Sequence, residues 1–175
     1  METRVEVRKV KESELSFLRE MAIQTFRETF GFDNTETQLE DYFNASYTPS
    51  NFIAEYEDDE TDTFFLIKGD EKVGFLKVSW GSAQTESLLD DAFEIQRIYI
   101  LKEYQGQGFG KVFFEFALQK AVDSGHEWAW LGVWEKNYRA QSFYKRYGFE
   151  KFAEHSFPVG EKIDTDWLLK KSLKK

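Results

Sequence analysis

Alternation of apolar and polar residues marks several stretches of this chain as strands. Thr3–Val10 alternates with a period of two, which predicts a half-buried strand. Thr63–Lys68 and Lys72–Trp80 are rich in β-branched and aromatic residues and flank a turn at Gly69, so they predict a hairpin. Phe93–Ile100 has the same composition and predicts a central strand.

Apolar residues at helical spacing predict helices in the first third of the chain. One helix begins at a cap near Ser13 and runs to about Phe30, where a glycine follows. A second helix runs from Thr35 through Tyr42. Pro49 then closes this helical region.

The second half of the chain alternates between helices and strands. A wide apolar stripe predicts a helix over Gly108–Ser124 that packs on a sheet and ends at Gly125 as a left-handed cap. Trp128–Trp134 predicts a strand, Asn137–Tyr147 a short helix stopped by Gly148, and the remaining residues two strands. No linker or repeat interrupts the pattern, so we expect a single domain over residues 1–175.

Composition narrows the class of protein. With 41% apolar and 18% aromatic residues, the chain has the means to build a core and is globular. No apolar run approaches the roughly 20 residues that span a bilayer, and Met1–Arg4 lacks the apolar segment of a signal peptide, so we expect a cytoplasmic protein that does not bind membranes. The absence of cysteine excludes disulfides, thiolate nucleophiles and Cys-ligated zinc.

The net charge of −9 argues against a nucleic-acid partner, because lysine and arginine supply most of the affinity for phosphate backbones. The same charge suits a cationic small molecule. An acidic balance also serves solubility, so charge alone leaves both interpretations open.

The segment Gln105–Lys111 places three glycines between a strand and the first turn of a helix. Such turns expose unpaired amides, and together with the helix dipole they favour a phosphate or pyrophosphate. A dinucleotide fingerprint would need the third glycine one residue later, and no Gly-Lys-Ser/Thr ending makes a nucleotide P-loop. A plain tight turn would explain the glycines equally well on their own.

A second motif favours the phosphate site over the plain tight turn. Asn137 can cap a helix whose Ala140, Phe143 and Tyr144 lie on neighbouring turns before Gly148 ends it. The two segments, in this order and with one strand between them, resemble the GNAT acetyltransferase superfamily. The resemblance is sharp from Phe93 to Phe149 and extends as a pattern of elements over most of the chain.

The resemblance implies an α/β (α+β) fold with a central mixed, mostly antiparallel, twisted sheet of about six or seven strands flanked by about four helices. It implies acetyl-CoA as cosubstrate and no metal. In the family the glycine loop grips the coenzyme pyrophosphate with main-chain amides, and the preceding strand pairs with the pantetheine arm. The coenzyme-binding residues implied are Ile98, Tyr99, Ile100, Gln105, Gly106, Gln107, Gly108, Phe109, Gly110, Lys111, Asn137, Tyr144 and Lys145.

The resemblance also suggests how protons move during transfer. At pH 7 an alkyl ammonium with a pKa near 10.4 costs roughly 4–5 kcal/mol to deprotonate, so a base is useful. Related polyamine acetyltransferases use a strand glutamate, but the matching residue is Gln96. Glu94 is left either to act through water or to be a solvated or ion-paired strand residue. Tyr144, beside the sulfur, is the expected proton donor, with aromatic packing as the alternative.

Other polar residues have weaker claims. We expect His126 and His155 to be structural, because neither has the spacing of a metal site or a nucleophile triad. Further groups could meet phosphates or substrate ammonium groups, although solvated positions explain them as well; they are Lys111, Lys145, Arg146, Glu36, Glu40, Asp41 and Glu86.

Substrate choice is expected to reside in the N-terminal third. Thr25–Phe30, followed by Asn34 and the helix around Tyr42, resembles the PaiA-type polyamine acetyltransferases of Gram-positive bacteria, which implies spermidine or spermine as substrate and is compatible with a homodimer. Two alternatives stay open. The protein acetylates another amine, such as an amino acid, an antibiotic or a protein N-terminus, or it is a non-catalytic acyl-CoA-binding regulatory module, which the departure at Gln96 would permit.

Overall fold

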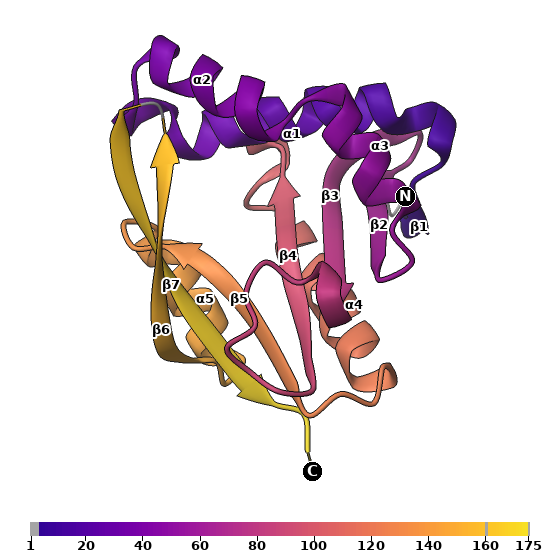
Figure 1. Ribbon diagram of the computed structural model, residues 1–175. Coiled ribbons are helices and arrows are strands. Elements are labelled where there is room, and N and C mark those ends of the chain that lie inside the picture. Colours follow the sequence, from indigo (N-terminus) through magenta and orange to yellow (C-terminus); the bar gives the residue numbers. More distant parts are fainter. Residues whose placement is uncertain (1–3, 160, 175) are drawn as a thin grey trace.

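The computed structural model describes residues 4–159 and 161–174, which form one seven-stranded sheet and five α-helices (Figure 1). The strands are β1 (Val5–Lys9), β2 (Thr61–Lys68), β3 (Glu71–Trp80), β4 (Ala92–Ile100), β5 (Trp128–Trp134), β6 (Glu150–Val159) and β7 (Lys162–Ser172). The helices are α1 (Leu15–Phe30), α2 (Glu36–Ser46), α3 (Pro49–Glu57), α4 (Phe109–Asp123) and α5 (Tyr138–Arg146). The expected mixed sheet is confirmed.

The sheet has the strand order β1-β2-β3-β4-β5-β7-β6. Its two halves are joined through β4 and β5, which share few backbone hydrogen bonds. Every neighbouring pair is antiparallel except β4 and β5. This parallel pair is joined only where Ala92–Glu94 faces Trp128–Trp130. Beyond that short ladder the two strands diverge, as Figure 1 shows. The divergence leaves one edge of β4 without a strand neighbour in the described chain.

A β-bulge in β4 shapes the same region. Lys77 of β3 pairs with Arg97 while Val78 pairs with Ile95, so Gln96 is an extra residue on β4. A bulge bends the strand and shifts the side-chain alternation by one position. Ile95 and Ile98 therefore belong to one core, although they are three positions apart in the sequence.

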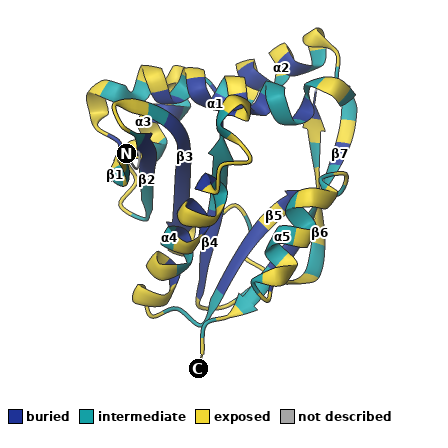
Figure 2. Ribbon diagram, turned by 180° about the vertical axis from the view of Figure 1, so that it is seen from behind, coloured by how far each residue is buried: buried dark blue, intermediate teal, exposed yellow. Residues whose placement is uncertain are grey.

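Helices cover both faces of the sheet (Figure 2). On one face, Phe113 and Phe114 of α4 pack with Leu131 and Val133 of β5, and side chains of α5 pack against that cluster. On the other face, Phe26 of α1 belongs to a second core with residues of α2, α3 and the sheet. The helix α2 contacts β6, so α1 and α2 extend across the diverging end of β4 and β5.

The boundaries of the first two helices differ from the predicted ones. Ser13 lies in a short 3₁₀ turn, Glu12–Glu14, and does not cap α1. Thr35, the expected first residue of the second helix, is the N-cap of α2, with its side chain accepting from the Gln38 amide, and the helix continues past Tyr42 to Ser46. Thr3, the expected start of the first strand, lies outside the described residues.

The prediction that Pro49 closes the helical region is wrong, because Pro49 begins α3. Proline at the first helical position lacks only an amide that would have no partner there, and its fixed φ suits the helix. Thr48 caps the same helix by accepting from the Asn51 amide at 3.2 Å. This additional helix accounts for the fifth where about four were expected.

Two kinds of feature are absent from residues 4–159 and 161–174. No helix there is long and apolar enough to cross a membrane. No three histidine, aspartate or glutamate side chains gather there in a way that would hold a metal ion.

Candidate functional site

The turn between β4 and α4 has the conformation that its glycines predict. Gly106 and Gly108 have φ values of +81° and +85°, in the left-handed region that disfavours side chains. Gly108 is the N-cap of α4, so no capping side chain covers the first amides of that helix. A Cβ added at Gly106, Gly108 or Gly110 would meet no atom within 4 Å. The backbone there faces open space that a ligand can approach.

This turn forms one wall of a cleft of about 440 Å³, which we call the loop cleft. It lies on the face of the sheet covered by α4 and α5. Ten of the thirteen predicted coenzyme-binding residues line it: Ile98, Tyr99, Ile100, Gln105, Gly106, Gly108, Gly110, Lys111, Asn137 and Tyr144. The fold therefore brings most of the predicted set together from three separate elements.

Three residues of the predicted set lie elsewhere. Phe109 is 8% exposed and belongs to the core beneath α4. Gln107 points outward, where its Oε1 accepts a hydrogen bond from Lys68 Nζ at 3.3 Å. Lys145 is exposed near the end of α5 and is not part of the cleft wall.

Of the three basic residues expected near the phosphates, Lys111 and Arg146 line the loop cleft and Lys145 does not. Arg139 and Arg146 line the loop cleft together with Lys111. Arg139 was not predicted, although its spacing from Arg146 would have placed both on one face of the helix, beside Phe143. These cations and the open glycine turn fit the phosphates of coenzyme A.

The edge of β4 that faces the cleft fits an amide-bearing chain. Beyond Glu94 no strand of the described residues pairs with this edge. Among residues 4–159 and 161–174, the one side chain that bonds to this edge is Gln105, whose Nε2 donates to the Ile100 carbonyl at 3.0 Å. The remaining backbone groups can pair with the amides of a pantetheine arm, as the resemblance implies.

Asn137 and Tyr144 face this cleft from α5. Asn137 caps the helix as predicted, with its Oδ1 accepting from the Ala140 amide at 3.2 Å. Tyr144 is half-buried and packs on Phe114 at 5.1 Å between ring centroids. Burial raises the pKa of Tyr144 to about 12, so its hydroxyl carries a proton at neutral pH.

A second cleft of about 580 Å³ lies on the face covered by α1 and α2, and we call it the acidic cleft. Its wall carries five carboxyl side chains: Asp41, Glu86, Glu94, Glu161 and Asp166. The two clefts share the lining residues Phe30, Gln96, Arg97, Tyr99 and Gly132, so they meet where β4 and β5 diverge.

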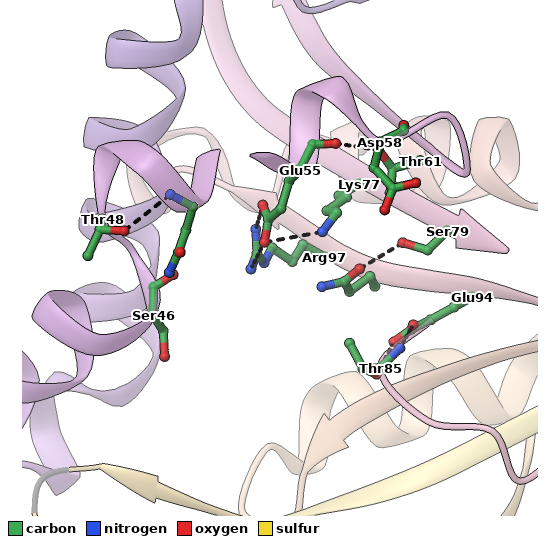
Figure 3. A network of polar contacts seen from close by, with 12 residues as sticks. Ser46, Thr48, Glu55, Asp58, Thr61, Lys77, Ser79, Thr85, Glu94 and Arg97 are labelled. Atoms are coloured by element: carbon green, nitrogen blue, oxygen red, sulfur yellow. Dashed lines mark hydrogen bonds and ion pairs between the residues drawn. The ribbon is translucent and has the colours of Figure 1, made fainter. Parts of the chain in front are cut away.

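A polar network fixes the β4 wall of both clefts (Figure 3). Arg97 reaches Glu55 of α3 through two hydrogen bonds of 3.0 and 3.2 Å, and Lys77 lies 3.3 Å from the same carboxylate. Burial opposes ionisation of Glu55, but the charges of Arg97 and Lys77 outweigh it and keep its pKa below the usual range. Gln96, at the bulge, accepts a 2.7 Å hydrogen bond from Ser79.

Glu94 lies in the acidic cleft, but hydrogen bonds already hold both of its oxygens. They accept from the amide and hydroxyl of Thr85 at 2.8 and 2.7 Å (Figure 3). The residue is only 3% exposed, and this burial raises its pKa in spite of the bonds from Thr85. The predicted role of Glu94 as a base stays a prediction.

The remaining predicted polar residues divide between the acidic cleft and the surface. Asp41 and Glu86 line the cleft, whereas Glu40 is exposed and Glu36 pairs with Arg27 at 2.5 Å. Each of the two histidines contacts a single carboxylate. His155, which lines the cleft, pairs with Glu86, and His126 lies 2.8 Å from Asp91.

Comparison with known proteins places this arrangement in a family. Residues 19–149 match the model of the acetyltransferase (GNAT) family. An uncharacterised N-acetyltransferase in the pepI 3′ region of Lactobacillus delbrueckii subsp. lactis is 36% identical, over 98% of this chain and 99% of its own length.

Solved structures share the fold at low sequence identity. The PaiA N-acetyltransferase from Thermoplasma acidophilum, in complex with coenzyme A, has a TM-score of 0.75 and 18% identity over 97% of this chain and 99% of its own. The spermidine N-acetyltransferase from Vibrio cholerae, in complex with CoA and spermine, has a TM-score of 0.68 and 16% identity over 97% and 95%. With the family match, these similarities show that the chain belongs to the GNAT family and is an acetyl-CoA-dependent N-acetyltransferase.

Proposed function

We propose that the protein acetylates a primary amine of a small polycation, a polyamine such as spermidine or spermine. The observation that carries this proposal is the acidic cleft, whose wall carries five carboxyl side chains and which adjoins the loop cleft. The structural likeness to a PaiA enzyme and to an enzyme solved with spermine supports the same substrate class.

The charge of the acidic cleft favours a cation because its basic residues are already paired. Arg97 is held by Glu55, and His155 by Glu86. Asp41, Glu161 and Asp166 have no such partner among the described residues. At an effective dielectric of about 20, each carboxylate at ~4 Å attracts an ammonium group by about 4 kcal/mol before desolvation is subtracted. A polyamine with several ammonium groups can use more than one of them.

We assign the coenzyme to the loop cleft. Backbone amides around Gly106, Gly108 and Gly110 would hold the pyrophosphate at the start of α4, with Lys111 and the α5 arginines nearby. The free edge of β4 would hold the pantetheine arm, and Asn137 would contact it from α5. Bound in this way, acetyl-CoA supplies an acetyl group activated as a thioester.

Tyr144 is the residue that we assign to the leaving sulfur. Its hydroxyl forms no hydrogen bond with another residue in 4–159 or 161–174, and it faces the loop cleft. A neutral phenol in this position can donate a proton as negative charge develops on the sulfur. Because the chain has no cysteine, the amine attacks the thioester directly without an acyl-cysteine on the protein.

A substrate panel with detection of free thiol tests the proposal. Purified protein and acetyl-CoA are mixed with spermidine and spermine, and separately with an amino acid, an aminoglycoside and a peptide with a free N-terminus. We expect the highest kcat/KM with the polyamines. Preference for one of the other amines would replace the polyamine, and coenzyme binding without thiol release from any amine would favour the regulatory module.

Variants of the acidic cleft sharpen the same test. Asp41→Asn removes a carboxylate from the cleft wall, and we expect it to raise the KM for spermidine several-fold. Glu40→Gln is the matched control, because Glu40 is the neighbouring residue on α2 but is exposed outside the cleft. Equal KM values for the two variants would argue against a cation site in this cleft.

A further inference from the structure

Asp166 lines the acidic cleft next to Gly132, a residue shared by the two clefts, although its strand comes near the end of the chain. On β7 it is the register partner of both Trp134 of β5 and His155 of β6. A Cβ added at Gly132 would come within 3.3 Å of Asp166 Oδ2. Gly132 lines both clefts, so this carboxylate stands beside the passage through which the two reactants must meet.

The carboxylate of Asp166 differs from that of Glu94 in being free to take a proton. Within residues 4–159 and 161–174, no hydrogen bond or ion pair holds an Asp166 oxygen, whereas Thr85 holds both oxygens of Glu94. Asp166 is half-buried and lines the acidic cleft, so one side of it stays accessible to a substrate. A proton acceptor needs an open lone pair directed at its donor.

The surroundings of Asp166 are mostly acidic or neutral. The charges of His155 on β6 and Asp164 on β7 act on Asp166, and Asp166 in turn acts on Tyr42 of α2 and Tyr99 of β4. The other titratable or charged residues that line the same cleft are Asp41, Tyr47, Glu86, Glu94, Arg97 and Glu161. Burial raises the pKa of Asp166 to about 7; the charge of His155 opposes this shift and that of Asp164 adds to it.

We infer that Asp166 is the base that takes a proton from the substrate ammonium group, beside the passage at Gly132. The inference rests on the proposed function, because it requires an amine in the acidic cleft. In the overall reaction the N–C bond forms, the C–S bond breaks and the ammonium nitrogen loses two protons. Asp166 takes the first and passes it to solvent. The second proton offsets the one that the sulfur receives, so the whole reaction releases one proton to solvent.

The pH profile of kcat/KM tests this assignment. For the wild type with its best amine, we expect a rise through an inflection near pH 7 as Asp166 loses its proton. Asp166→Asn keeps the size of the side chain but accepts no proton, so kcat/KM should fall by about 100-fold or more and the inflection should disappear. Glu94→Gln should retain the inflection whatever its turnover. Glu154→Gln, at an exposed β6 position outside both clefts, should match the wild type within about twofold.

A readout that does not depend on turnover keeps the inference testable if the variant is inactive for another reason. Side-chain carboxyl ¹³C resonances of the protein without coenzyme are titrated by NMR. One resonance, absent from Asp166→Asn, should titrate near pH 7 and shift when spermidine is added. Circular dichroism and coenzyme A affinity equal to those of the wild type show that the variant is folded.

The outcomes separate this inference from the proposed function. If another amine is the substrate and Asp166→Asn loses the inflection, the polyamine proposal fails and the base assignment holds. If Asp166→Asn keeps the inflection and most of its activity, or if the Asp166 carboxyl resonance of the wild type titrates below pH 5, the assignment is overturned even with spermidine as substrate. If Glu94→Gln alone loses the inflection, Glu94 is the base. If no amine is acetylated, both proposals fail.

Discussion

Replacing Gly108 by Asp is expected to weaken coenzyme A binding, and the structure separates two causes. Gly108 has a φ of +85°, which costs a residue with a side chain about 1 kcal/mol or more. Its added Cβ would meet no protein atom within 4 Å, so the new carboxylate extends into the loop cleft. Gly108→Asn has nearly the same shape and accepts the same backbone conformation, so the difference between the two variants isolates the charge.

The size of the charge effect follows from Coulomb's law. A carboxylate about 6 Å from a phosphate charge repels it by about 0.7 kcal/mol at the dielectric of water and about 2.8 kcal/mol at an effective value of 20. Screening by salt reduces the contribution of the second phosphate. We therefore expect Gly108→Asp to bind coenzyme A about 1–3 kcal/mol more weakly than Gly108→Asn, or about 5- to 150-fold.

Isothermal titration with coenzyme A measures this difference directly. The difference between the Asp and Asn variants should shrink as salt is raised from about 0.05 to 0.5 M, because the Debye length falls below the separation of the charges. The difference between Asn and the wild type should not change with salt, since it reflects backbone strain. If the two variants bind coenzyme A with equal affinity at low salt, the pyrophosphate does not bind at this turn and the assignment is refuted.

Three further predictions concern the walls of the clefts. Tyr144→Phe should lower kcat by about 10- to 100-fold with little change in coenzyme affinity, measured by thiol release and titration; unchanged kcat would leave Tyr144 a packing residue. Gly132→Val should fill the passage between the clefts and reduce kcat/KM for the amine far more than the affinity for coenzyme A. Equal losses in both quantities would contradict an amine that reaches the thioester from the acidic cleft. Glu55→Gln should cost about 2–4 kcal/mol in urea unfolding, because it leaves two largely buried cations facing no carboxylate, and exposed Glu57→Gln should cost less than about 0.5 kcal/mol.

The Glu55 prediction has a definite pH dependence. Its pKa is depressed in the folded protein, so its contribution to the free energy of unfolding is complete above the unfolded value, about 4.3, and is lost as pH falls through the folded value. The difference in stability between wild type and Glu55→Gln should therefore be constant above about pH 6 and shrink at lower pH. A difference that grows below pH 4 would refute this account of the pair.

The sequence by itself determined the local features of the site. Positive φ at Gly106 and Gly108 and the cap at Asn137 depend on neighbouring residues, so the loop and the start of α5 are where the pattern predicted them. The hairpin of β2 and β3 has the same short-range origin. Pro49 was ambiguous because proline both stops helices and suits their first position, and only the following turn of α3 decided between these.

Only the tertiary structure decided which distant residues meet. The bulge at Gln96 arises from pairing with β3, and it directs the following side chains in a way that a regular alternation does not show. Asp166 reaches the acidic cleft next to Gly132 because β7 inserts between β5 and β6. Its raised pKa reflects burial among residues from other elements, and burial is a property of packing that no local pattern encodes.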